Sequence, residues 1–213
     1  MSKISILKKG VCDTAKRSYN EALVAGTSGN VSAFDYESKL MAITPSGLDY
    51  SIMCEDDIMV IDFNGSIVEG THKPSSEWRM HAEIYKQRND ILAVLHTHSP
   101  YATSFAVLKK RVPLILIEML PFLGGDIPVA EFCLPGSEEL GREALKVLDK
   151  RNACLLSNHG TLAVGTTLEQ AHLRAVYVED ASKIYHYACS VGIPNCVPEE
   201  AAEIMRRKFN LKK

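Results

Sequence analysis

The stretch ILAVLHTH, residues 91–98, combines an apolar run with a polar end. Its apolar part predicts a buried strand, because the run is short and rich in aliphatic side chains. Residues two apart on a strand face the same side, so His96 and His98 project together from the end of this strand. Imidazole nitrogens are good ligands for divalent ions such as zinc. The stretch therefore predicts a buried strand and offers two candidate ligands of a metal site, although two histidines alone are weak evidence for one.

A second apolar strand also ends near a histidine. Residues 153–157, ACLLS, are followed by a turn that contains His159 and Gly160. Three histidines with an open fourth position are typical of a catalytic metal ion. The alternative is that all three are surface or hydrogen-bonded histidines at loop edges, and the residues alone leave both interpretations open. The remaining histidines lack a comparable context and are predicted to be structural or solvent-facing: His72, His81, His172 and His186.

Helical and strand patterns alternate along the whole chain. Helices are expected over residues 4–25, 75–88, 99–110, 137–151 and 167–190 and near the C-terminus, and strands over 30–34, 39–44, 58–63, 66–70, 91–98, 114–119, 153–157 and the segment after His159. No linker or low-complexity stretch interrupts the alternation, which is typical of one α/β domain over residues 1–213.

Three loops of small polar residues stand between these elements. They are GTSGN (26–30), TPSG (44–47) and the two serines of KPSSEW (73–78). Backbone N–H groups, hydroxyls and the positive end of a helix that begins at Ser75 are suited to binding a phosphate. The serine pair alone favours an ordinary helix cap, but three such loops together favour a phosphate pocket. Glu77 would then lie in the first helical turn, placed for proton transfer.

Composition excludes several classes of partner. The 213 residues carry a formal net charge of −2. This overall charge does not favour binding to nucleic acid or to an anionic membrane surface. No run approaches the roughly 20 apolar residues that a membrane span needs, and no signal-peptide pattern is present. The six cysteines form no Cys-x-x-Cys pair, which favours reduced thiols. We expect a soluble, cytoplasmic protein.

The motifs follow one another in an order that resembles that of a known protein family. GTSGN, ITPSG (43–47), KPSSEW, HTH (96–98) and SNHG (157–160) follow one another as in the class II aldolase/adducin superfamily, over residues 8 to 190. The resemblance implies a three-layer α/β/α sandwich around a central, mostly antiparallel sheet. It also implies a cyclic homotetramer with active sites between subunits.

The resemblance also implies roles for individual residues. One divalent ion per subunit would be held by His96, His98 and His159, with zinc the best fit and manganese or cobalt alternatives. Glu77 would be the acid–base residue and would also contact the metal when substrate is absent. The phosphate-binding positions fall on Gly29, Asn30, Ser46, Gly47, Ser75 and Ser76, with Thr27 nearby.

The implied reaction is cleavage of a carbon–carbon bond next to a ketone. Such cleavage leaves an enediolate, whose negative charge a divalent ion stabilises as a Lewis acid. Glu77 would protonate the enediolate to give dihydroxyacetone phosphate. The similar ribulose-phosphate 4-epimerases carry aspartate where this chain has Glu77, which favours an aldolase. The metal ligands argue against a non-catalytic adducin-like scaffold.

The segment VPLILIEML (112–120) departs from the fuculose-phosphate aldolase branch of the family. Ile117 stands where that branch has a tyrosine supplied by a neighbouring subunit, and Glu118 lies beside it. Glu118-Met119 is similar instead to methylthioribulose-1-phosphate dehydratases. Glu118 is therefore either a second catalytic acid–base group or a carboxylate in a subunit interface. An apolar Ile117 favours a deoxyketose 1-phosphate such as 5-deoxyribulose 1-phosphate over L-fuculose 1-phosphate, with the dehydratase reaction as the alternative.

Overall fold

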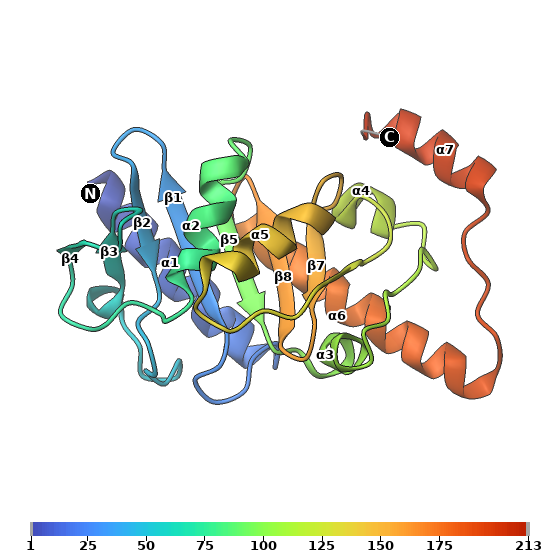
Figure 1. Ribbon diagram of the computed structural model, residues 1–213, viewed down its shortest axis with the longest axis horizontal. Helices are drawn as coiled ribbons and strands as arrows, with labels where there is room; N and C mark the ends of the chain where they lie inside the picture. Colours follow the sequence, from blue (N-terminus) through green and yellow to red (C-terminus); the bar gives the residue numbers. More distant parts are fainter. Residues whose placement is uncertain (1, 212–213) are drawn as a thin grey trace.

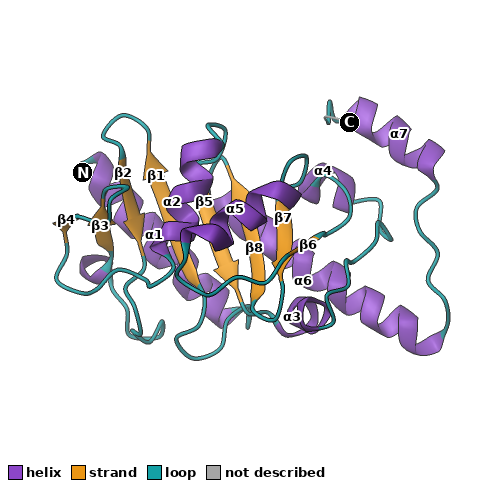
Figure 2. Ribbon diagram, viewed as in Figure 1, coloured by secondary structure: helices purple, strands orange, loops and turns teal. Residues whose placement is uncertain are grey.

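The computed structural model describes residues 2–211. Within them, eight strands form one sheet in the order β4-β3-β2-β1-β5-β8-β7-β6, with helices on both faces (Figure 1 and Figure 2). The strands are β1 (Asn30–Asp35), β2 (Leu40–Ile43), β3 (Met59–Ile61), β4 (Ile67–Glu69), β5 (Ala93–Thr97), β6 (Val129–Ala130), β7 (Ala153–Leu156) and β8 (Gly160–Gly165). Every neighbouring pair is antiparallel except β6 and β7. The predicted α/β/α sandwich with a mostly antiparallel sheet is confirmed.

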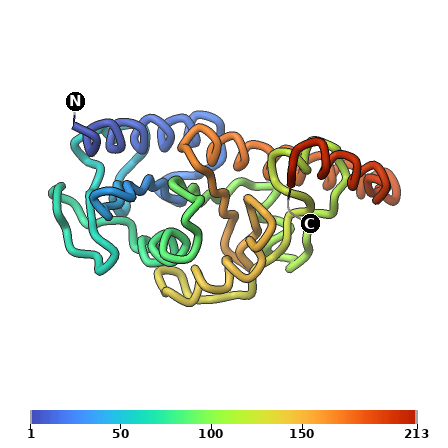
Figure 3. The backbone as a smooth tube through the Cα atoms, turned by 90° about the horizontal axis from the view of Figure 1, so that it is seen from above, coloured from blue at the N-terminus to red at the C-terminus, as the bar shows by residue number. Residues whose placement is uncertain are grey.

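The helices divide between the two faces. They are α1 (Lys3–Asn20), α2 (Trp78–Gln87), α3 (Pro100–Val107), α4 (Met119–Leu123), α5 (Glu138–Val147), α6 (Leu168–Val191) and α7 (Glu199–Lys208), with a short 3₁₀ helix, η1 (Glu55–Asp57). Seen from above, α1 and α6 lie along one side of the sheet and α2 and α5 along the other (Figure 3). None of the helices in residues 2–211 has the combination of length and apolarity that a bilayer span requires.

Two buried cores result from the alternation of side chains along the strands. In β1, Val31 and Ala33 belong to the core under α1 and α6, whereas Phe34 belongs to the core under α2 and α5. In β5, Leu95 faces the first core and Val94 the second. The even-numbered residues of both strands therefore face α2. Because Asn30 lies opposite His96 in the β1–β5 pairing, the polar ends of these strands meet on the α2 side.

The strand expected over residues 114–119 is wrong. Residues 113–118 are irregular, and Met119 begins the short helix α4. An apolar run of this length does not distinguish a strand from a buried helix. Here the chain makes an isolated bridge between Val112 and Ile127, and the Leu114 carbonyl accepts from Val197 N–H at 2.8 Å. Leu114, Ile115 and Leu116 pack against the core under α6.

Two helix boundaries also differ from expectation. The first helix ends at Asn20 rather than near Gly26, because Ala22 turns the chain with a left-handed φ of 57° and Leu23 then enters the core. The second begins at Trp78 rather than at Ser75. The N–H of Ser75 donates to the carbonyl of Thr44 at 3.0 Å, so the serine pair belongs to a loop that precedes the helix.

Candidate metal centre

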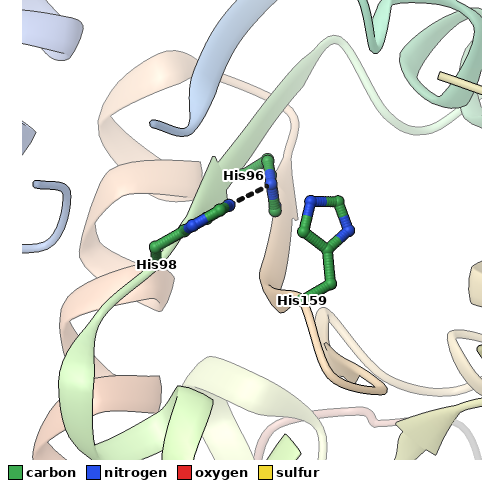
Figure 4. A group of neighbouring side chains, drawn as sticks. All are labelled: His96, His98 and His159. Atoms are coloured by element: carbon green, nitrogen blue, oxygen red, sulfur yellow. Dashed lines mark hydrogen bonds between the residues drawn. The ribbon is translucent and has the colours of Figure 1, made fainter. Parts of the chain in front are cut away.

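Three histidines converge at the end of the central strands. His96 is the fourth residue of β5, His98 follows the strand directly, and His159 precedes β8. Nε2 of His96 lies 3.0 Å from Nε2 of His98, and one nitrogen from each of the three rings falls within 4.8 Å of the others. Figure 4 shows the three rings turned toward a common point. The structure thus brings together the three predicted ligands.

The carboxylate of Glu77 lies beside two of these rings. Its Oε2 is 3.1 Å from Nε2 of His96 and its Oε1 is 3.3 Å from Nε2 of His159. The side-chain amide of Asn30 donates to Oε2 at 2.9 Å. Asn30 therefore orients the carboxylate with its side chain, a contact that the prediction of a phosphate-binding Asn30 did not include.

Burial and charge set the protonation of this cluster. Burial opposes ionisation of Glu77, but the hydrogen bond and charge of His96, with Asn30 and His159, outweigh it and hold the pKa of Glu77 well below its usual range. Burial, together with the neighbouring histidines, lowers the pKa of His98 to about 4. Burial also lowers the pKa of His159. At neutral pH His98 and His159 therefore offer neutral imidazoles and Glu77 an ionised carboxylate, which are the states that bind metal ions.

The residues present fit a divalent ion. A tetrahedral ion with ligands at 2.0–2.1 Å separates neighbouring ligand atoms by about 3.3 Å, and the three contacts above measure 3.0, 3.1 and 3.3 Å. Nδ1 of His96 lies 2.8 Å from the carbonyl of Thr161, so this nitrogen carries the proton and Nε2 is free to coordinate. Oε1 of Glu77 is buried without a hydrogen-bond partner, as expected of an atom that faces a cation.

A cavity of about 210 Å³ opens beside the cluster. Its lining includes every residue predicted to bind phosphate, together with Glu77 and two of the histidines: Thr27, Ser28, Gly29, Asn30, Pro45, Ser46, Gly47, Ser75, Ser76, Glu77, His98, Pro135 and His159. Backbone bonds hold two of the loops together, because Ser46 N–H donates to Lys73 and Ser75 N–H to Thr44. The third loop is fixed by the Tyr50 hydroxyl, which donates to the carbonyl of Gly29 at 2.7 Å.

Glu118 is not brought to this cavity. It precedes α4 and is absent from the residues that line the space beside Glu77. Its neighbour Ile117 is 39% exposed. Within one chain, neither residue contributes to the metal centre.

Some residues in and near the site were not predicted as site residues. Ser28, Pro45 and Pro135 line the cavity, and Ser28 and Pro45 lie inside the loops already singled out. His81 is completely buried on α2, with Nδ1 2.6 Å from the hydroxyl of Ser32. Of the two alternatives predicted for His81, structural or solvent-facing, its full burial fits the structural one, but no local pattern indicates that Ser32 would be its partner.

Gly160→Ala is expected to distort the metal centre. A Cβ at this position would collide with the Thr97 carbonyl oxygen and approach the rings of His98 and His96 at 3.0 and 3.1 Å. We expect metal affinity to fall by roughly 10- to 100-fold, the range for lost support of a ligand, as measured by competition with a chromogenic chelator. Gly192→Ala is the matched control, because its Cβ meets nothing within 4 Å. Wild-type affinity in Gly160→Ala would contradict the geometry.

His81 is expected to make the protein acid-sensitive. Burial, with the charge of His96, lowers the pKa of His81 to about 3, whereas an unfolded histidine titrates near 6.5. Below pH 6.5 the unfolded chain therefore binds a proton that folded His81 does not, and stability falls with pH. In chelator-treated protein, His81→Gln should reduce the loss of unfolding free energy between pH 7 and 5 by about 2 kcal/mol.

Urea unfolding at the two pH values measures this difference. His186→Gln, on an exposed part of α6, serves as the control and should keep the wild-type dependence. An equal loss of stability in wild type and His81→Gln would refute the assignment.

Comparisons with known proteins identify the family of the chain. A family model, the class II aldolase and adducin N-terminal domain, matches residues 9–186. The chain is 37% identical over 203 residues to the 5-methylthioribulose-1-phosphate/5-deoxyribulose-1-phosphate aldolase of Rhodospirillum rubrum, covering 95% of this chain and 90% of the relative. It is 36% identical over 194 residues to the 5-deoxy-D-ribulose 1-phosphate aldolase of Bacillus thuringiensis serovar kurstaki, covering 91% of each.

The fold is shared with a solved structure. An L-fuculose 1-phosphate aldolase superposes with a TM-score of 0.92 at 41% identity, over 99% of this chain and 98% of that one. The match of the family model covers most of the chain, and both relatives exceed 30% identity over nearly their whole length. The chain therefore belongs to the class II aldolase and adducin family.

Proposed function

We propose that the protein is a metal-dependent aldolase that cleaves a ketose 1-phosphate into dihydroxyacetone phosphate and a short aldehyde. The position of the Glu77 carboxylate carries this proposal, because it lies between His96 and His159 and also lines the cavity of small polar loops. A group that moves protons thus stands between a candidate Lewis-acid site and a candidate phosphate site. Aldolases among the relatives support the same reaction class.

His96, His98 and His159 would hold one divalent ion. Zinc suits three neutral imidazoles best, and manganese or cobalt are alternatives. When bound, the ion supplies Lewis-acid stabilisation of negative charge on the substrate oxygens. Glu77 would lie against the ion when no substrate is present.

The chain's own residues would orient the substrate and move its proton. Phosphate would bind to the loops around Gly29, Ser46 and Ser76, remote from the reacting bond, so its binding energy fixes the geometry of the reacting carbons. In cleavage the C3–C4 bond breaks, its electron pair stays on C3, and the C4 hydroxyl gives its proton to the ionised Glu77 carboxylate as the aldehyde forms. Glu77 then delivers a proton to C3, which completes dihydroxyacetone phosphate.

Residues near the part of the substrate that becomes the aldehyde would determine which sugar phosphate is cleaved. Ile117 and Glu118 lie outside the cavity of their own chain, so we propose that they act at the site of a neighbouring subunit in a homotetramer. An apolar Ile117 suits an aldehyde with few hydroxyl groups. The preferred substrate is therefore 5-deoxyribulose 1-phosphate or its methylthio analogue, and the preferred location is the cytoplasm.

Product analysis with zinc-loaded protein tests the proposal. 5-Deoxyribulose 1-phosphate, methylthioribulose 1-phosphate and L-fuculose 1-phosphate are supplied separately. A coupled reductase follows dihydroxyacetone phosphate, and mass spectrometry detects loss of water. We expect the deoxy and methylthio sugars to be cleaved faster than L-fuculose 1-phosphate. A dehydrated or epimerised product without dihydroxyacetone phosphate would overturn the aldolase assignment and leave the metal site standing.

A further inference from the structure

Helix α3 begins two residues after His98, and its first N–H groups need partners from elsewhere. Ser99 occupies the N-cap and is buried, yet its side chain makes no capping bond. Pro100 has no N–H to satisfy. The N–H of Thr103 donates to the carbonyl of Ser99 at 2.9 Å. Within this first turn, the N–H groups of Tyr101 and Ala102 therefore remain to be satisfied.

A carboxylate on helix α6 accepts hydrogen bonds from both of these N–H groups. Oε1 of Glu179, in the middle of α6, accepts from Tyr101 N–H at 3.0 Å, and Oε2 accepts from Ala102 N–H at 2.9 Å. The negative charge also lies at the positive end of the α3 dipole, where it is favourable. Helices α3 and α6 pack side by side (Figure 1). Glu179 thus fixes the start of α3 relative to α6.

The same contact restrains His98. Only Ser99 separates this histidine from α3, so the position of its backbone depends on where the helix begins. The His96 ring is held from behind by the carbonyl of Thr161. For the His98 ring, the one hydrogen bond recorded within residues 2–211 is to Nε2 of His96, on the side that faces the other ligands. The orientation of the His98 ring is therefore set by the position of its backbone and not by a hydrogen-bond partner behind the ring.

We propose that Glu179 is a positioning residue for His98, acting through the N-terminus of α3; the inference rests on the metal site proposed above. Its carboxylate holds the turn between β5 and α3 in place, and this turn directs the His98 imidazole toward His96 and His159. A ligand held in advance binds its ion without the cost of being ordered. Loss of Glu179 weakens metal binding even though Glu179 does not touch the ion.

The first test compares zinc affinity in Glu179→Ala, Glu179→Gln and Ser137→Ala by competition with a chromogenic chelator, with the cobalt absorption spectrum as a second readout. Glu179→Ala should lose about 10-fold in affinity, the lower end for lost support of a ligand. Glu179→Gln keeps one acceptor oxygen and should lose less. Ser137→Ala removes the cap of α5 at a residue outside the cavity lining, and controls for general destabilisation.

A double-mutant cycle with His98→Ala separates positioning from stability. If Glu179 acts through His98, then Glu179→Ala lowers affinity in the wild type and has no further effect once His98 is absent. Unchanged affinity in Glu179→Ala, or an equal loss with and without His98, overturns the proposal. If Glu179→Ala does not fold, Glu179→Gln replaces it in the cycle under the same criteria. If His98→Ala itself leaves affinity unchanged, the metal site fails and this inference fails with it.

Discussion

Glu77→Gln is expected to lower kcat by about 10²- to 10⁴-fold, the usual contribution of a positioned acid–base group, while metal content stays close to wild type. Glutamine keeps the volume of the side chain and an oxygen that accepts the bond from Asn30. It cannot carry a proton between solvent and the substrate carbon. The substitution therefore removes proton transfer and leaves the histidines in place.

Deuterium exchange isolates this step. Dihydroxyacetone phosphate in D₂O should exchange the proton of its reacting carbon in the presence of zinc-loaded wild type, without any aldehyde. Glu77→Gln should abolish the exchange, and metal analysis on the same sample shows whether the ion was retained. Glu143→Gln, on α5 outside the cavity lining, is the matched control and should exchange as the wild type does. Exchange at the wild-type rate in Glu77→Gln would remove this residue from proton transfer.

His98→Ala is expected to have the other large effect. Loss of a direct ligand should cost more than loss of an outer partner, so affinity for zinc should fall by roughly 100-fold or more. Activity at limiting zinc should fall by about 10³-fold or more, because the ion contributes several kcal/mol to stabilising developing charge. His98 is half-buried rather than central to the core, so the variant should still fold.

Metal content after dialysis and a chelator titration measure the loss. His186→Ala removes an imidazole from an exposed position of α6 and should leave both zinc affinity and activity unchanged. Excess zinc should restore part of the lost occupancy in His98→Ala. Full zinc occupancy after dialysis in His98→Ala would show that another group, rather than this histidine, completes the coordination.

Local pattern predicted much of this site. His96 and His98 were placed together because strand side chains alternate, and His159 was placed at a strand end because an apolar run meets a glycine turn there. The three polar loops were recognised from their small residues and line one cavity. Each of these inferences needed only neighbours within a few positions along the chain.

The rest depended on contacts between distant segments. The bond from Asn30 to Glu77 follows from the β1–β5 pairing and from where α2 begins, and residues 75–77 gave no sign that Ser75 would pair with Thr44. The run 114–119 was misassigned because the core residues against which it packs lie far along the chain. Glu179 lies 77 and 78 positions from the residues that it caps, which no local pattern can reveal.

The irregular segment 113–118 has a consequence for how new specificities arise. It forms no strand within the described chain and carries Ile117 on its surface, so its residues can be exchanged without shifting the register of the sheet. His96, in contrast, is completely buried at the end of β5, where a change endangers folding. Under the role proposed for Ile117 and Glu118, libraries that vary these two positions, and keep Ile115 and Leu116 packed against the core, should therefore yield folded proteins of altered sugar preference at high frequency. Under the role proposed for this segment, substitutions in it can change the substrate during evolution while the three histidines and Glu77 are retained.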